Sequence, residues 1–173
     1  MLLKETALVR LLSLKIPVLL FLGPRVMELD EQGCAVKIPL RWQSRNHLGS
    51  MYFGALCAGA DIAGGLVAAR LIYSKHRGVN LIFADLKADF LKRADGDVVF
   101  RSRDGLRVAE AVREADRTGE RVTLPVEVVA TVPDKYGDEP VARFTLGLSM
   151  KRRGAPPKAE PVAAEGKVKA ARG

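Results

Sequence analysis

The sequence predicts an α+β domain in which a curved, mostly antiparallel sheet of about six strands wraps around one long central helix. Three observations lead to this prediction. Several stretches alternate apolar with polar residues, as strands with one buried face do. A run of small and apolar residues from about Tyr52 to Tyr73 is typical of a buried helix, which would be about 30 Å long. A length of 173 residues suits a single domain.

The strands follow in order along the chain. Alternation on both sides of "DEQG" (30–33) predicts a β-hairpin, and "DVVFRS" (97–102) predicts a short strand. Between them lies a longer strand, whose apolar face consists of Ile82, Ala84, Leu86, Ala88 and Phe90. Apolar rows over 122–132 and 142–150 predict two further strands, joined by the turn-rich "PDKYGDEP".

Two helices interrupt the strands. Asp104 is placed to N-cap "GLRVAEAVREADRT", and Gly119 marks the end of that helix. The length and the small residues of the other, central helix would also suit a membrane span. Asp61 would then lie near the bilayer centre, and half-buried strands surround the segment. A core helix is the simpler interpretation, so no transmembrane segment is expected.

Three parts are expected along the chain: an N-terminal helical segment packed on the domain (1–24), the α+β domain (25–151) and a disordered tail (152–173). The N-terminal part combines an amphipathic helix over about Lys4–Ser13 with an apolar turn at Ile16–Leu22. Packing onto the domain is favoured over lying on a membrane surface. No signal peptide is predicted.

The formal net charge of +8 is concentrated in the tail. From Lys151 to Gly173 there are seven Lys/Arg and two Asp/Glu residues, which supply +5 of the total. This stretch is rich in Ala, Pro, Lys and Glu and has no aromatic residue, so it is expected to be a solubilising appendage. Nucleic-acid binding is therefore not expected.

Cysteine and histidine are too sparse to indicate metal chemistry. Cys34 and Cys57 form neither a metal-binding spacing nor a disulfide framework, which suits a reducing, cytoplasmic compartment. The sequence places no base for Cys57, so this residue is interpreted as a small buried hydrophobe. His47 and His76 are isolated and are predicted to be solvated loop residues. No metal site is expected.

The stretch "NHLGSMYFGALCAGAD" resembles the signature of hotdog-fold thioesterases of the phenylacetate-pathway (PaaI-like) type. That signature runs Asn, two residues, Gly, two residues, His-Gly-Gly, and ends in Ala-Asp. The matching positions are Asn46, Gly49, Gly54, Ala60 and Asp61. Tyr52 stands where the signature has His, and Phe53 where it has the first Gly. In this respect the chain is more similar to an uncharacterised hotdog subgroup in which Tyr is common at that point.

The resemblance implies a hotdog fold over roughly residues 25–150 and hydrolysis of an acyl thioester. Asp61 would be the general base that activates water, and Asn46 would contact the thioester or the water. The N–H groups of Phe53 and Gly54, with Tyr52 and Gly49 beside them, would bind the substrate and stabilise the oxyanion. The substrate would be an acyl-coenzyme A or acyl-carrier thioester, with no further cofactor, held in the groove of a homodimer or a dimer of dimers.

Elementary physical chemistry supports a site at the same residues. The first turn of a helix presents N–H groups without an intrahelical partner at the positive end of the helix dipole. An ionised carboxylate at Asp61 would lie among small apolar neighbours, so it needs a partner or a raised pKa. Either property suits a general base.

The site residues also have purely structural interpretations. Asp61 alone could be a hydrogen-bonded structural residue, Asn46 a turn residue and Tyr52 a wall residue. Lys75, His76 and Arg77 cap a helix C-terminus in the simpler interpretation and contact coenzyme A phosphates in the functional one. The main alternative function is a non-catalytic acyl- or lipid-binding hotdog module; a dehydratase and a nucleic-acid-binding tail rank below it.

Overall fold

The structure, a computed structural model, describes residues 2–7, 16–76 and 78–154. Residues 3–7 of the predicted N-terminal helix are helical, and the rest of that helix lies outside the described residues. The predicted disordered tail also lies outside them from residue 155 onward. The predicted apolar turn is a short helix, α2 (Pro17–Phe21), which leads into the sheet.

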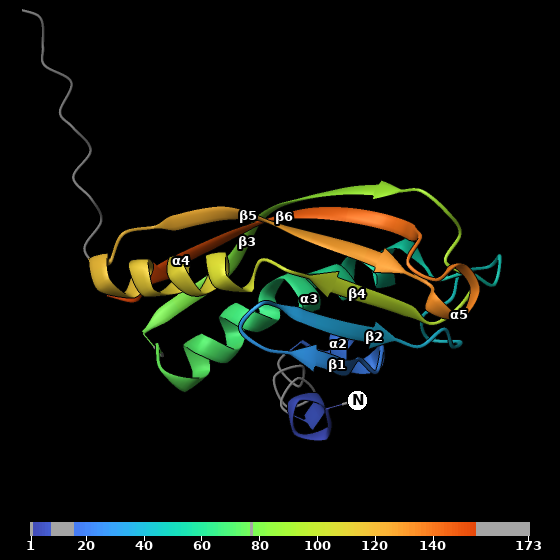
Figure 1. Ribbon diagram of the computed structural model, residues 1–173, viewed down its shortest axis with the longest axis horizontal. Helices are drawn as coiled ribbons and strands as arrows, with labels where there is room; N and C mark the ends of the chain where they lie inside the picture. The colour runs from blue at the N-terminus through green and yellow to red at the C-terminus, as the bar shows by residue number, and fades with distance from the viewer. Residues whose placement is uncertain (1, 8–15, 77, 155–173) are drawn as a thin grey trace, which may run out of the picture.

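Six strands form one antiparallel sheet in the order β1-β2-β4-β5-β6-β3. Their bounds are β1 (Arg25–Leu29), β2 (Cys34–Ile38), β3 (Val79–Phe90), β4 (Val98–Ser102), β5 (Val122–Thr131) and β6 (Pro140–Arg152). The predicted hairpins β1–β2 and β5–β6 pair directly. Strand β4 lies between them, and the long strand β3 pairs with β6 at the end of the sheet (Figure 1).

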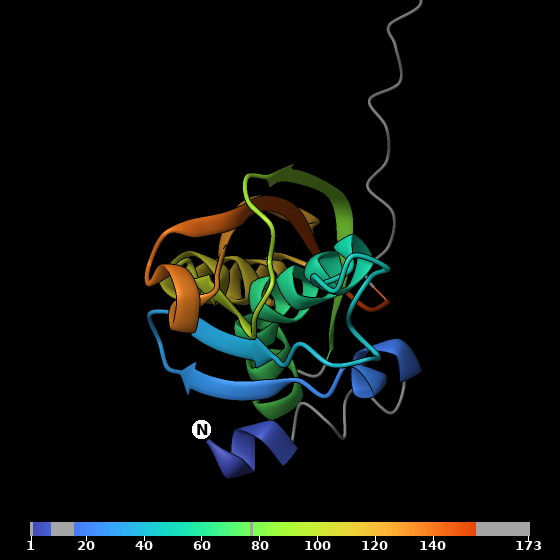
Figure 2. The same cartoon turned by 90° about the vertical axis from the view of Figure 1, so that its right-hand side faces the viewer.

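Helix α3 (Phe53–Ser74) lies inside the curve of this sheet, as Figure 2 shows. The predicted arrangement of a curved sheet around one long helix is therefore confirmed. Glycines allow the close approach: a Cβ atom on Gly59 would lie 2.3 Å from the ring of Phe100 on β4. The buried Cys34 on β2 donates its S–H to the carbonyl of Ala63, at 3.0 Å. Helix α3 is long and apolar enough to cross a membrane. However, 67% of its most apolar 18-residue stretch is buried inside the domain, so α3 is a core helix.

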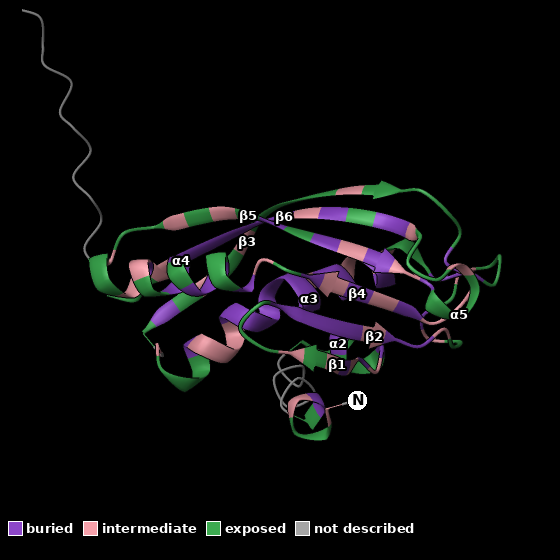
Figure 3. Cartoon of the chain, in the orientation of Figure 1, coloured by how far each residue is buried: buried purple, intermediate pink, exposed green. Residues whose placement is uncertain are grey.

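Helix α4 (Gly105–Thr118) adds a second layer, with its small apolar face turned inward (Figure 3). Gly119 ends it in the left-handed conformation (φ 73°), as the sequence predicts. Asp104 precedes the helix, but its carboxylate makes no capping hydrogen bond. It accepts hydrogen bonds from the Arg107 side chain and from the backbone N–H of Glu127 instead, and so ties α4 to β5. A short helix, α5 (Pro133–Tyr136), forms part of the β5–β6 connection.

Strand β3 differs from the simple alternation that its sequence suggests. A bulge between Phe83 and Asp85 shifts the side-chain register. Before the bulge, Leu81 and Phe83 turn partly inward, whereas Leu86 and Phe90 beyond it are exposed. Strand β3 therefore carries apolar side chains to the surface at the edge of the sheet.

The packing of α3 yields a matched pair of stability predictions. Gly59→Ala should lower the free energy of unfolding by about 2 kcal/mol, because the new methyl group overlaps the fully buried Phe100 ring. Gly64→Ala should be neutral or stabilising, because its Cβ would lie 3.3 Å from the flexible Leu146 side chain and alanine favours the helix. Urea unfolding of both variants measures the difference; equal stabilities would contradict the packing described for α3.

Candidate functional site

The first turn of α3 has backbone donors without acceptors. Tyr52 is the extended N-cap residue (φ −64°, ψ 139°), and its N–H donates to the carbonyl of Ser44, at 2.7 Å. No side chain caps the helix. Among the described residues, the N–H groups of Phe53 and Gly54 meet no acceptor. These two donors, at the positive end of the helix dipole, can polarise a carbonyl group and stabilise an oxyanion.

Aromatic rings surround this turn. The Tyr52 ring folds over Gly54, where a Cβ atom would lie 2.5 Å from it. The Tyr52 and Phe53 rings meet edge to face with centroids 4.8 Å apart, and Phe53 meets Phe90 of β3 at 6.4 Å. The Phe53 side chain is 58% exposed. The departures from the hotdog signature therefore give the first turn an apolar, partly open wall.

Asp61 lies two helical turns beyond Gly54, on a half-buried stripe of α3 that it shares with Cys57 and Ala58. Its carboxylate makes no hydrogen bond or ion pair with any residue that the structure describes. Burial raises the pKa of the Asp61 carboxyl to about 6. A raised pKa is one of the two states expected for a carboxylate in such surroundings, and it suits a general base.

The N–H donors and Asp61 are too far apart on one chain to act on the same bond. Asp61 lies seven positions after Gly54, which corresponds to about 10 Å along the helix axis. A general base must lie within about 3 Å of the water that it activates. On one chain, therefore, these N–H groups and Asp61 do not meet at a single substrate atom.

The loop before α3 is organised by Asn46. Its side-chain oxygen accepts hydrogen bonds from the N–H groups of Leu48 (2.9 Å) and Ser50 (3.3 Å). Its side-chain amide donates to the Ser50 hydroxyl, at 3.2 Å. The exposed Gly49 completes the turn with φ 78°. This geometry matches the structural interpretation of Asn46 as a turn residue.

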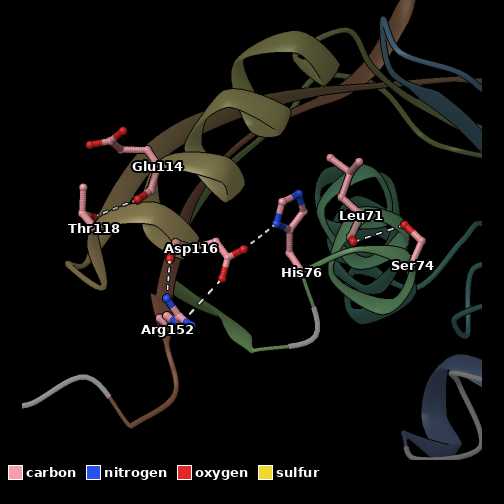
Figure 4. Close-up of polar contacts among 7 residues, drawn as sticks. All are labelled: Leu71, Ser74, His76, Glu114, Asp116, Thr118 and Arg152. Atoms are coloured by element: carbon pink, nitrogen blue, oxygen red, sulfur yellow. Dashed lines mark hydrogen bonds and ion pairs between the residues drawn. The ribbon is translucent and has the colours of Figure 1, made fainter.

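At the other end of α3, His76 lies in a loop, as predicted, but its side chain is partly buried and paired, and not solvated. Nδ1 of His76 lies 2.7 Å from a carboxylate oxygen of Asp116 on α4, and Arg152 donates to the Asp116 carbonyl at 3.1 Å (Figure 4). Asp116 of α4 therefore connects His76, at the end of α3, with Arg152 of β6. Lys75 is exposed, and Arg77 lies outside the described residues. Sequence reasoning missed the pair because Asp116 is distant along the chain.

The remaining candidate groups do not show reactive features. Burial raises the pKa of the Cys34 thiol to about 12 and also raises the pKa of Cys57, which disfavours the nucleophilic thiolate. His47 is exposed. Gln43, which the sequence did not single out, has a buried side-chain oxygen that meets no hydrogen-bond donor within the described part of the chain. Among the described residues, no group of three His, Cys, Asp or Glu side chains could hold a metal ion.

The raised pKa of Asp61 predicts a pH-dependent effect of Asp61→Asn on stability. The pKa is about 6 in the folded state and about 4 in the unfolded state, so ionisation of Asp61 lowers the stability of the wild type as the pH rises between these values. The variant should therefore be more stable than the wild type above pH 6, by about 1–3 kcal/mol, and this advantage should vanish below about pH 4. Urea unfolding of the wild type and the variant, repeated from acidic to neutral pH, measures this difference in stability. A constant difference at every pH would indicate an ordinary pKa.

Solved structures with the same architecture include three bacterial proteins. One is a Pseudomonas aeruginosa protein of unknown function that is described as a probable thioesterase. It is 27% identical to this chain, the TM-score is 0.68, and the match covers 85% of this chain and 95% of that protein. A Haemophilus influenzae thioesterase is 14% identical, with a TM-score of 0.57 over 76% and 80%. A Chlorobaculum tepidum protein of unknown function is 14% identical, with a TM-score of 0.73 over 86% and 94%. The fold is that of hotdog thioesterases.

No curated protein matches the sequence. A family model described as a domain of unknown function, DUF4442, matches residues 4–148. This match includes both long helices and nearly all of the sheet. The narrower assignments, to the PaaI-like type and to the subgroup with Tyr in place of His, stay predictions. The chain belongs to the DUF4442 family.

Proposed function

We propose that the protein hydrolyses an acyl thioester, with water as the nucleophile. The observation that carries the proposal is the half-buried Asp61, which has no partner among the described residues, on the same helix as the N–H groups of Phe53 and Gly54, which meet no acceptor there. A desolvated carboxylate without a partner destabilises a folded protein, which is a common feature of catalytic groups. The similarity to a probable thioesterase from Pseudomonas aeruginosa supports the same reaction class.

In the proposed reaction, the N–H groups of Phe53 and Gly54 bind the thioester carbonyl oxygen. The ionised Asp61 takes a proton from water as the water oxygen attacks the carbonyl carbon. The N–H groups stabilise the resulting oxyanion, and loss of one such donor costs about 3 kcal/mol in comparable sites. The intermediate collapses by breaking the carbon–sulfur bond, and Asp61 returns the proton to the departing sulfur. A pKa of about 6 leaves Asp61 mostly ionised at neutral pH.

The site is proposed to form between two copies of the chain, each supplying N–H donors to the Asp61 of the other. This assembly, a homodimer or a dimer of dimers, resolves the separation of the two halves on α3. Asn46 and Gly49 shape the loop beside the first turn, and Tyr52 and Phe53 offer apolar surface to the acyl group. The substrate class is an acyl-coenzyme A or acyl-carrier thioester, in the cytoplasm, with no additional cofactor.

A non-catalytic acyl-binding module is the second candidate. The Phe53 ring beside these N–H groups favours it, because the thioesterase signature has glycine at this position. If this second candidate is right, the protein binds acyl thioesters saturably but does not hydrolyse them, so no free thiol appears.

Loss of the base is the direct test of the thioesterase proposal. Thiol release from short, medium, long and aromatic acyl-coenzyme A esters should fall at least 100-fold in Asp61→Asn, because the amide cannot accept the proton from water. Glu110→Gln, on the exposed face of α4, is the matched control and should retain wild-type turnover. Equal turnover in wild type and Asp61→Asn would remove Asp61 from the mechanism. Binding without thiol release by the wild type would favour the acyl-binding module.

A second prediction tests the backbone donor. Phe53→Pro removes the backbone N–H group of the first helical residue. Proline is tolerated at this helical position, and Tyr52 already has the extended conformation that a residue before proline requires. The rate constant kcat should fall roughly 100- to 1,000-fold. Phe53→Gly removes the ring and keeps the N–H group, so it should retain activity. Equal losses in the two variants would assign the effect to the ring.

Mixing these two inactive variants tests the shared site. In a mixed dimer of Phe53→Pro and Asp61→Asn chains, one of the two sites combines an intact donor with an intact base. Co-refolded equimolar chains should therefore recover about a quarter of wild-type activity, since about half of the dimers are mixed. No recovery, with mixed dimers demonstrated by mass spectrometry, would contradict a site shared between chains.

A further inference from the structure

An exposed apolar surface lies apart from the first turn of α3, on α2 and the loop after β2. Leu19 of α2 and Leu22, which follows the helix, are buried in the core, whereas the other apolar side chains of α2 are exposed. Trp42, which is 69% exposed, meets Phe21 edge to face with ring centroids 5.5 Å apart. We call this surface the α2–Trp42 patch; its members are Ile16, Val18, Leu20, Phe21 and Trp42.

The chain around the patch is basic and lacks acidic residues. Residues 16–27 and 39–60 contain no Asp or Glu. Arg41 and Arg45 are exposed beside Trp42, and neither guanidinium group pairs with any residue that the structure describes. Asp97, whose carboxylate reaches this loop, is already bound to the Lys37 ammonium (2.8 Å) and to the backbone N–H of Leu40 (2.9 Å).

The loop that carries these residues is held in place. The Ser44 hydroxyl donates to the carbonyl of Pro39 at 2.8 Å and accepts from the N–H of Arg41 at 3.0 Å. The N–H of Arg45 donates to the carbonyl of Arg41, also at 3.0 Å. Trp42 and both arginines therefore extend from one ordered turn, so presenting them together requires little additional ordering.

We propose that the α2–Trp42 patch docks the protein on an anionic membrane surface. Aromatic and aliphatic side chains in one patch suit the boundary between headgroups and acyl chains, and unpaired arginines suit anionic lipid headgroups. A second copy of the patch is a poor partner, because a symmetric contact would bring arginines of both chains together without carboxylates to pair them. Docking goes beyond the proposed hydrolysis and does not depend on it.

The same turn connects the patch to the candidate site. The carbonyl of Ser44 accepts the N–H of Tyr52, the N-cap residue of α3, at 2.7 Å. A membrane bound at the patch would thus hold the first turn of α3 near the lipid interface. Acyl chains concentrate at such an interface.

Trp42 is the sole tryptophan of the chain, so its fluorescence reports on the patch directly. The full-length protein is mixed with vesicles of phosphatidylcholine, with and without phosphatidylglycerol. Docking predicts a shift of the Trp42 emission to shorter wavelength and quenching by brominated acyl chains with the anionic vesicles, both reversed by high salt. Unchanged emission, together with no co-sedimentation, would overturn the proposal. So would a shift that depends on protein concentration and not on lipid, which would indicate a second copy on the patch.

Charge variants separate a defined docking surface from general attraction. Arg41→Gln with Arg45→Gln should weaken vesicle binding roughly 25-fold, about fivefold for each arginine. The matched control, Arg113→Gln with Arg143→Gln, removes the same charge from exposed positions on α4 and β6 and should change binding by less than about twofold. Equal losses in the two double variants would overturn docking at the patch. Circular dichroism of each variant verifies folding.

Discussion

The close packing of α3 against the concave face of the sheet is the constraint on which the rest of the structure depends. Gly59 and Gly64 place the helix backbone directly against Phe100 and Leu146, which belong to different strands. A side chain at Gly59 would overlap the Phe100 ring and push the helix away from the sheet. The fixed position of α3 then determines where its first turn and Asp61 lie, so a packing requirement sets the geometry of the candidate site.

This constraint also explains why Asp61 is poorly solvated. The small residues that let α3 approach the sheet leave few polar groups on the same helix, and Asp61 meets none of them. Its position therefore lowers stability at neutral pH. A purely structural carboxylate would be expected to have a hydrogen-bond partner at such a position, and the described residues provide none. This lack of a partner is the observation behind the proposed role of Asp61 in proton transfer.

Local patterns predicted most of the fold, and the failures involve residues that are distant in sequence. Alternation identified every strand, and the small-residue run identified α3. The insertion of β4 between two hairpins could not be predicted, because strand order depends on long-range pairing. The bulge in β3 has no clear local signal, and the partnership of His76 with Asp116 forms only when α3 meets α4. For the site, the signature located Asp61 and the first turn but not the ring contacts of Phe53.

Strand β3 connects the edge of the sheet with the proposed shared site. Its outer edge pairs with no described strand, and it exposes Leu86 and Phe90. Exposed charged residues limit strand addition at such an edge, and Asp85, Lys87 and Asp89 place charges between the apolar side chains of β3. Phe90 also contacts Phe53 at the first turn of α3, so this edge and the oxyanion donors belong to one continuous surface. In the shared site proposed above, the Asp61 of a second chain would approach the N–H groups of Phe53 and Gly54, and therefore also this edge of the sheet.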